Sequence, residues 1–132
     1  FEFIMDQIAD MLIMIKNASL REHPSVTVPF SKVKNSIATC LVDKGYLKGA
    51  EKKMEKGFPV LTLMLAYNDR EPKVHNVKRI SKPSRRLYIG SKSIKSFKNG
   101  YGMTVLSTPK GILSDKDAKK ELVGGEILFS IW

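Results

Sequence analysis

The sequence is poor in the residues that build reactive or cross-linked sites. A single cysteine, Cys40, excludes an internal disulfide and a metal site made of several cysteines. Because Cys40 falls within the apolar pattern of a predicted helix, we expect its thiol to be buried and unreactive. The two histidines, His23 and His75, have no suitable catalytic partner nearby in the sequence, and no G-x-S-x-G motif, P-loop or paired-carboxylate spacing occurs. We therefore predict no enzyme activity, no catalytic residues, no metal and no cofactor.

Long hydrophobic runs are also missing. No apolar stretch approaches the roughly 20 residues that a membrane-spanning helix needs, so we predict no membrane partner. Residues 1–17 lack a basic leader and a small-residue cleavage site, which argues against a signal peptide. The lone cysteine favours a reducing compartment. With 132 residues and 42% hydrophobic content, the chain can fold as one globular domain or as two small ones.

Acidic residues are scarce in one part of the chain. Lysine and arginine number 23 against 13 acids, a net charge of +10, and no acid occurs between Glu71 and Asp115. Charge of one sign over such a length is self-repelling unless a polyanion neutralises it. Nucleic acid is therefore the favoured partner, ahead of a merely basic surface. An acidic membrane surface is a weaker alternative, because the bases do not lie on one long amphipathic helix. The bases of this acid-free segment are Lys73, Lys78, Arg79, Lys82, Arg85, Arg86, Lys92, Lys95, Lys98 and Lys110.

Hydrophobic periodicity predicts two helices early in the chain. Residues 6–19 carry apolar side chains at the i, i+3, i+4 and i+7 spacing of one helical face. Residues 31–44 repeat this pattern, with Ser31 as the predicted cap and Gly45 as the stop signal. The apolar stripe that we predict for this second helix consists of Val33, Ile37, Ala38 and Leu41.

The remainder of the pattern predicts an α+β fold of two small lobes. The N-terminal lobe, residues 1–72, consists of helix, strand, helix and further strands. The C-terminal lobe, residues 73–132, is basic and mostly β, with one short helix predicted over residues 114–122. Strands are predicted over residues 25–29, 46–51, 60–67, 74–81, 86–90, 103–107 and 125–132.

The stretch VLSTPKGILSD, Val105–Asp115, places a polar insert between two apolar pairs. Hydroxyls such as those of Ser107 and Thr108 can read base edges and ribose 2′-OH groups. Lys110 can neutralise a phosphate, and Gly111 allows a close backbone approach. Taken alone, the insert is more simply interpreted as a turn whose residues serve turn chemistry.

Other residues favour an RNA-binding surface. Gly124, Gly125 and Glu126 precede the last predicted strand, where two glycines permit another backbone to come close. Tyr88 follows the adjacent arginines Arg85 and Arg86, and a tyrosine beside arginines can stack on a base or sugar. Its alternative role is that of a half-buried tyrosine in a sheet. The cations of Lys82, Arg85 and Arg86 would attract phosphates without sequence preference.

Four segments in order closely resemble the family of small-subunit ribosomal protein eight, in its bacterial or organellar form. They are IADMLIMIKN (Ile8–Asn17), RISKPSRRLY (Arg79–Tyr88), GYGMTVLSTPKGILSDKDA (Gly100–Ala118) and GGEI (Gly124–Ile127). The resemblance implies a two-lobed α+β fold and a structural role in the small ribosomal subunit. It also implies binding to an irregular helical element in the central domain of small-subunit rRNA, early in subunit assembly.

The same resemblance implies roles for particular residues and partners. Ser107 and Thr108 would contact RNA bases and backbone, and Lys110, next to Gly111, would contact a phosphate. Gly124, Gly125 and Glu126 would lie beside the same RNA surface, with Tyr88 at its edge. Neighbouring small-subunit proteins and the messenger of the protein's own operon are implied as further partners, and the ribosome of the cytoplasm or of an organelle as the location. Contacts to a second RNA segment are implied for Lys16, Asn17 and Lys32.

The chain departs from the family pattern at three positions. Pro109 stands where a third hydroxyl is usual, which removes one RNA contact and stiffens the loop. Met14 replaces a usual arginine, and Ser84 replaces the glycine that usually follows the proline. Two other classes of function stay open: a generic basic module that binds DNA as well as RNA, and an enzyme of RNA metabolism. The first lacks a clear recognition helix, and the second lacks a metal or nucleophile cluster.

Overall fold

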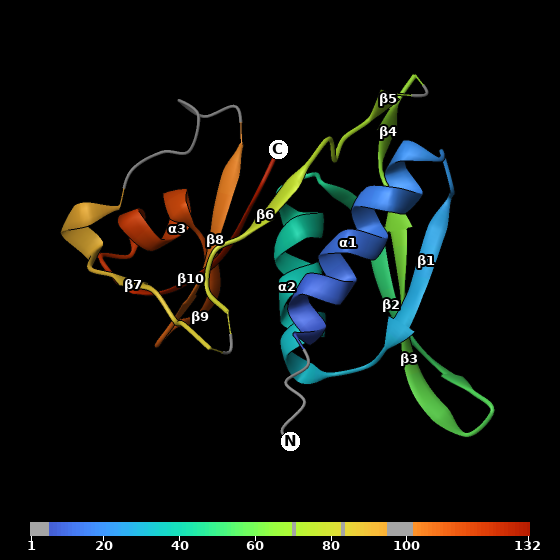
Figure 1. Cartoon of the computed structure of the whole chain (residues 1–132), viewed down its shortest axis with the longest axis horizontal. Helices are drawn as coiled ribbons and strands as arrows, with labels where there is room; N and C mark the ends of the chain where they lie inside the picture. Colours follow the sequence, from blue (N-terminus) through green and yellow to red (C-terminus); the bar gives the residue numbers. More distant parts are fainter. Residues whose placement is uncertain (1–5, 70, 83, 95–101) are drawn as a thin grey trace. The chain divides into compact units, whose positions relative to one another are not determined.

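The computed structural model describes residues 6–69, 71–82, 84–94 and 102–132. The chain divides into two compact units (Figure 1). The N-terminal unit comprises Asp10–His75, and the C-terminal unit joins the start of the chain, as far as Ala9, to Asn76–Trp132. Helix α1 therefore begins in one unit and continues in the other. The prediction of an α+β fold is confirmed.

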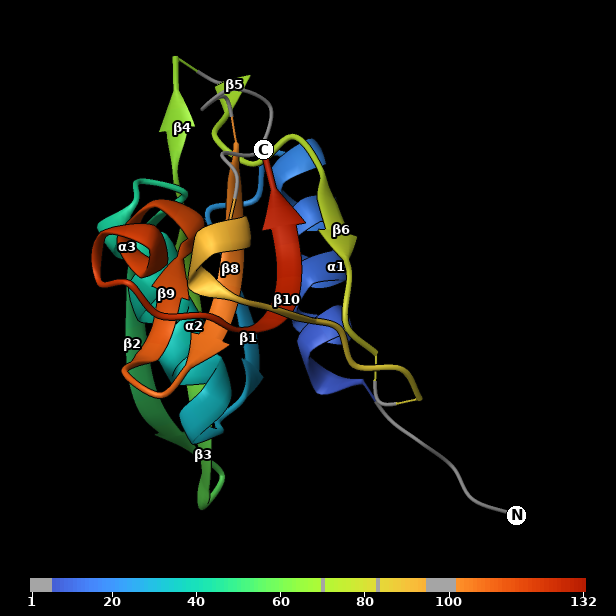
Figure 2. The same ribbon diagram turned by 90° about the vertical axis from the view of Figure 1, so that its left-hand side faces the viewer.

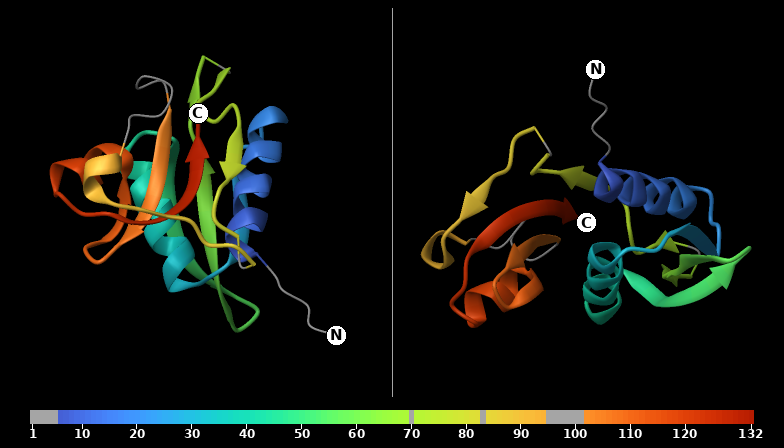
Figure 3. Two further views of the ribbon diagram at one scale, coloured as in Figure 1. Left: turned by 60° about the vertical axis from the view of Figure 1, so that its left-hand side comes forward. Right: turned by 90° about the horizontal axis from the view of Figure 1, so that it is seen from below.

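The N-terminal unit is an antiparallel sheet with two helices on one face (Figure 3). Its strand order is β1-β3-β2, so the apolar strand β3 is central. Alternate residues of β3, namely Leu61, Leu63 and Leu65, are buried, as expected for a strand with one face against a core. The elements are α1 (Gln7–Leu20), β1 (Ser25–Pro29), α2 (Lys32–Asp43), β2 (Leu47–Glu55), β3 (Phe58–Leu65), β4 (Tyr67–Asn68) and β5 (Glu71–Pro72).

Both early helices form where the apolar spacing predicts them. Ser31 caps α2, since its Oγ accepts a hydrogen bond from the backbone N–H of Lys34 at 3.1 Å. The predicted stripe on α2 is wrong at one position, because Val33 is exposed and Lys34 is buried instead. Lys34 lies three, four and seven residues before the buried Ile37, Ala38 and Leu41, so the aliphatic stem of this lysine completes the stripe.

Two side chains modify these expectations. Cys40, which we predicted to be buried, is half-buried, because it lies beside the α2 stripe rather than on it. Tyr67 donates its hydroxyl proton to the carbonyl of His23 and so ties β4 to the residues that follow α1. Burial, with a smaller contribution from the charge of Glu22, raises the pKa of Tyr67 above its usual value.

The C-terminal unit is built on a second antiparallel sheet, in which β10 lies between β6 and β8 (Figure 2). The strand order is β6-β10-β8-β9, and the short β7 pairs with the start of β10. Helix α3 begins where the sequence predicts, because the Oγ of Ser114 accepts from the backbone N–H of Asp117. The elements are β6 (Val77–Arg79), β7 (Tyr88–Ile89), the 3-10 helix η1 (Ser91–Ser93), β8 (Met103–Thr108), β9 (Gly111–Ser114), α3 (Asp115–Lys120) and β10 (Gly125–Ile131).

Several strands differ in length from those predicted, because pairing with a neighbouring strand, and not the local residue pattern, sets their extent. The strand predicted over residues 74–81 contains only β6, which pairs with the last residues of β10. The strand predicted over residues 86–90 is reduced to β7, in which Tyr88 and Ile89 pair with Glu126 and Gly125 of β10. The carbonyl of Leu87 also accepts from the backbone N–H of Ile127. Strand β9 was not predicted, although its residues form the second apolar pair of the insert. Within the described ranges, no helix is long and apolar enough to cross a membrane.

Candidate nucleic-acid interface

The polar insert is the tip of the β8–β9 hairpin. Thr108 pairs with Gly111, so Pro109 and Lys110 form a two-residue turn between the strands. The Thr108 hydroxyl donates to the carbonyl of Gly111 at 2.8 Å and accepts from the backbone N–H of Lys110 at 3.2 Å. Gly111 has a φ of 112°, a conformation that side-chain-bearing residues rarely adopt. The insert is therefore a turn, and the hydroxyl of Thr108 maintains its shape.

Three predicted site residues lie side by side on neighbouring strands. Glu126 at the start of β10 pairs with Ser107 on β8 and with Tyr88 on β7. Directly paired residues on adjacent antiparallel strands point to the same face and lie about 5 Å apart at Cβ. The Tyr88 side chain is 67% exposed, whereas Ser107 and Glu126 are half-buried. An aromatic ring, a carboxylate and a hydroxyl thus form one row, which we call the cross-strand row.

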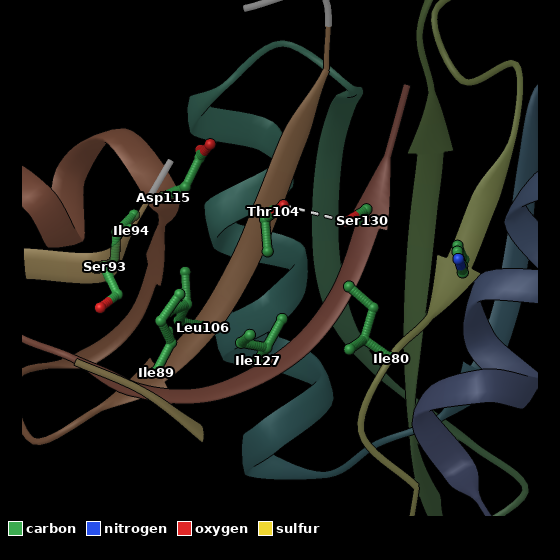
Figure 4. A pocket seen from close by; sticks show the side chains of 10 residues that line it. Ile80, Ile89, Ser93, Ile94, Thr104, Leu106, Asp115, Ile127 and Ser130 are labelled. Carbon is green, nitrogen blue, oxygen red and sulfur yellow. Dashed lines mark hydrogen bonds between the residues drawn. The ribbon is translucent and has the colours of Figure 1, made fainter. Parts of the chain in front are cut away.

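The opposite face of the same strands belongs to the core of the unit. Leu106, Ile127 and Ile89 each adjoin a member of the cross-strand row, and side chains alternate faces along a strand. These three pack around the buried Ala118 of α3. A cavity of about 280 Å³ lies on this apolar face (Figure 4). The cavity is therefore on the other side of the sheet from the cross-strand row.

The two adjacent glycines allow the strands of the row to come together. A side chain on Gly124 would overlap the backbone of Ile89 and Gly90, and one on Gly125 would overlap the backbone carbonyl of Ser107. The start of β10 can pass between β7 and β8 only if neither position carries a Cβ. Both glycines thus support the row by close packing.

A basic loop precedes Tyr88. Lys82 and Arg85 exchange backbone hydrogen bonds of 2.8 and 2.9 Å, which closes the loop into a tight turn. The buried Ser81 hydroxyl fastens the loop, accepting from the backbone N–H of Leu87 at 2.9 Å and donating to its carbonyl at 3.2 Å. The side chains of Lys82, Arg85 and Arg86 are exposed. The fastening role of Ser81 was not anticipated from the sequence, in which it appears as an ordinary strand residue.

Two other cations are engaged by carboxylates. Arg79 Nε lies 3.0 Å from Asp6 Oδ2, and the arginine also donates to the carbonyl of Leu128. Arg79 is therefore part of the framework of this unit. Lys110 Nζ lies 3.1 Å from Oε2 of Glu121, at the end of α3, and both side chains are about half exposed. Glu121 is a neighbour of the predicted site that sequence reasoning missed, because eleven residues separate it from Lys110.

The structure does not bring all predicted site residues into one unit. Lys16, Asn17 and Lys32 belong to the N-terminal unit, where Lys16 is half-buried and the other two are exposed. Lys95 and Lys98 of the acid-free segment lie outside the described residues. No group of three histidine, cysteine, aspartate or glutamate side chains that could hold a metal ion occurs in the described parts of the chain.

Comparison with known proteins gives one consistent result. The family model described as "Ribosomal protein S8" matches residues 6–132. "Small ribosomal subunit protein uS8" of Ruegeria pomeroyi is 43% identical over 128 residues, covering 96% of this chain and 98% of the relative. The protein of the same name from Dictyoglomus thermophilum is 43% identical over 129 residues, 98% of each chain. That of Clostridium novyi is 43% identical over 127 residues, covering 96% of this chain and 97% of the relative.

Proposed function

Because the chain belongs to the ribosomal protein S8 family, a family of structural proteins and not of enzymes, we propose that it binds small-subunit rRNA as a component of the small ribosomal subunit. The single observation that carries this proposal is the cross-strand row of Tyr88, Glu126 and Ser107. A ring that can stack, a carboxylate that can accept from base amino groups and a hydroxyl are combined there on one rigid sheet.

The surroundings of the row suit an RNA backbone. The exposed cations of Lys82, Arg85 and Arg86 lie in the loop that leads into Tyr88, and such cations bind phosphates irrespective of sequence. The major groove of a regular A-form helix is too narrow for side chains to read. We therefore propose that the row reads an irregular, bulged helix in the central domain of the rRNA, during early subunit assembly.

We propose different roles for the hydroxyls of Ser107 and Thr108. The Thr108 hydroxyl is already engaged with Gly111 and Lys110, so its contribution to binding is mainly to hold the turn. The Ser107 hydroxyl makes no hydrogen bond to another residue in the described parts of the chain. Its position on β8 places it beside Glu126. Ser107 is accordingly the hydroxyl that we propose to contact RNA directly.

The test is a filter-binding titration with two RNAs, the bulged central-domain helix and a perfectly paired helix of equal length, each at two salt concentrations. We expect a strong preference for the bulged helix that persists as salt rises, because base and shape contacts are screened less than phosphate contacts. Equal binding to both RNAs that collapses with salt would mean a generic basic module and would overturn the proposal.

Substitutions of Ser107 and Thr108 test these two roles separately. Ser107→Ala removes one hydrogen bond of about 1 kcal/mol, so we expect roughly fivefold weaker binding to the bulged helix. Thr108→Ala should also weaken binding, whereas Thr108→Ser, which keeps the hydroxyl, should not. Equal affinities of the Thr108 variants would remove the turn hydroxyl from the site, and unchanged affinity of Ser107→Ala would remove Ser107. Urea unfolding of each variant controls for loss of the fold.

We propose further partners in addition to the central-domain helix. Lys16, Asn17 and Lys32 are proposed to contact a second rRNA segment, so Lys16→Gln with Lys32→Gln should weaken binding to a longer RNA but not to the isolated helix. A messenger from the protein's own operon that folds into the same bulged helix would compete for the row, and a competition titration tests this. In the ribosome, cytoplasmic or organellar, neighbouring small-subunit proteins complete the proposed set of partners.

A further inference from the structure

We propose that Glu121 is an affinity-determining residue of the RNA site, because its carboxylate competes with RNA phosphate for Lys110. This inference rests on the proposed function, since it presupposes that Lys110 contacts RNA. The starting observation is the ion pair of 3.1 Å between Lys110 Nζ and Glu121 Oε2. In the protein without RNA, the cation of the β8–β9 turn is thus already occupied by a carboxylate of its own chain.

Both ends of this ion pair are attached to ordered backbone. Lys110 sits in the two-residue turn and donates its backbone N–H to the Thr108 hydroxyl. Glu121 ends α3, where its backbone N–H donates to the carbonyl of Asp117 at 2.9 Å. Surface ion pairs are weakened mainly by the entropy of holding two long side chains together. That cost remains here, but the turn that carries Lys110 and the helix before Glu121, which packs against β8 and β9, hold the two side chains within reach of each other.

Within the described parts of the chain, the Glu121 carboxylate is paired with Lys110 alone. The end of α3 is closed by backbone groups, as Leu122 and Val123 donate their N–H groups to the carbonyls of Lys119 and Ala118. A negative side chain is also unfavourable at the C-terminal end of a helix, where the exposed carbonyls already carry partial negative charge. Lys110 is therefore the partner that stabilises this carboxylate.

A phosphate that binds Lys110 competes with Glu121, because two anions in contact with one ammonium group repel each other. The two side chains are 55% and 50% exposed, so the exchange takes place in water and its effect is modest. Exposed ion pairs of this kind change an equilibrium by up to about fivefold. Removal of the Glu121 charge should therefore strengthen RNA binding by about two- to fivefold in low salt. The gain should shrink as salt screens both the ion pair and the phosphate contact.

The experiment is a double-mutant cycle on the full chain, with the bulged central-domain helix as the probe. Glu121→Gln, Lys110→Gln and the double variant are titrated at two salt concentrations. We expect Glu121→Gln to tighten binding, Lys110→Gln to weaken it, and Glu121→Gln to have little effect when Lys110 is already replaced. Glu55→Gln is the control for net charge, because Glu55 is an exposed acid at the end of β2 in the other unit.

The outcomes separate the two proposals. If Lys110→Gln weakens binding but Glu121→Gln leaves it unchanged, the competition is refuted while the RNA site stands. If Glu121→Gln tightens binding equally with and without Lys110, or no more than Glu55→Gln does, the effect is one of overall charge and the competition is again refuted. If neither Lys110→Gln nor Ser107→Ala changes affinity, the proposed RNA site itself is wrong, and the role of Glu121 falls with it.

Discussion

At the scale of single residues, Leu122 adopts an unusual backbone conformation. Its φ is 58°, in the left-handed region, and its side chain is 79% exposed. It occupies the position after the α3 cap where glycine is usually found, because the chain must reverse there to direct the N–H of Val123 back to Ala118. The left-handed conformation costs a residue with a Cβ about 1–2 kcal/mol.

We expect Leu122→Gly to stabilise the protein by about 0.5–1 kcal/mol. Glycine adopts the left-handed conformation without strain, which favours the folded state. Part of this stabilisation is lost, because glycine is more flexible than leucine in the unfolded chain. Urea denaturation measures the change in the free energy of unfolding. Leu122→Ala is the matched control, since it removes the same exposed side chain but keeps the Cβ. Equal stability of the alanine and glycine variants would contradict the explanation by strain.

At the scale of elements, the site depends on how closely three strands approach. The first residues of β10 run between β7 and β8, and Gly125 faces the backbone of Ser107 without room for a methyl group. A Cβ there cannot be accommodated by a rotamer change, because the obstacle is backbone. The strands must move apart, which would separate Ser107 from Glu126.

Gly125→Ala is therefore expected to destabilise the protein by about 1–3 kcal/mol, as overpacking of a tight site does. It should also weaken binding to the bulged RNA helix by more than Ser107→Ala does, because the whole row is displaced. Gly90→Ala provides the control, since a Cβ at Gly90 meets no atom within 4 Å. Urea denaturation and the RNA titration give the two readouts. Similar behaviour of the two alanine variants would contradict this account of Gly125.

At the scale of the whole molecule, the C-terminal unit is assembled from both ends of the chain. Asp6 uses one carboxylate oxygen to cap α1, accepting from the backbone N–H of Ala9 at 3.1 Å. The other oxygen accepts from Arg79 Nε at 3.0 Å, across 73 residues of sequence. The side chain of Asp6 is 21% exposed and that of Arg79 is 14% exposed, so this ion pair is shielded from solvent more than a surface ion pair is.

We expect Asp6→Asn to destabilise the protein by about 1 kcal/mol, because the amide still caps α1 but no longer carries the charge opposite Arg79. A double-mutant cycle with Arg79→Gln, followed by urea denaturation, measures the coupling between the two residues. We expect a coupling of about 1 kcal/mol. Additive effects would show that the charge of Asp6 is not coupled to Arg79 and would contradict this account.

The division of the chain into lobes depends both on local composition and on contacts between residues far apart in the sequence. The charge distribution separates a basic C-terminal half from a nearly neutral N-terminal half. The domain boundary that we predict between residues 72 and 73 stays a prediction. A boundary drawn along the sequence could not include the contact of Asp6 with Arg79, because no local pattern links residues so far apart. Likewise, Arg79 was indistinguishable from the exposed bases of the acid-free segment until its partners were known.

The sequence by itself determined the helices, the fold class and the basic character of the C-terminal half. Helical spacing, the caps at Ser31 and Ser114, and charge are local properties, carried by residues within a few positions of one another. The family resemblance also came from short segments that can be read directly. These features needed no knowledge of which strands pair.

The tertiary structure alone decided how the candidate site is arranged. Strand ends, the register that aligns Tyr88, Glu126 and Ser107, and the overlap that forbids a side chain on Gly125 all depend on neighbours from distant parts of the chain. The same holds for the partner of Lys110, which the sequence left as one cation among many. Register and ion pairing are properties of pairs of segments, and a pair forms only when the chain has folded.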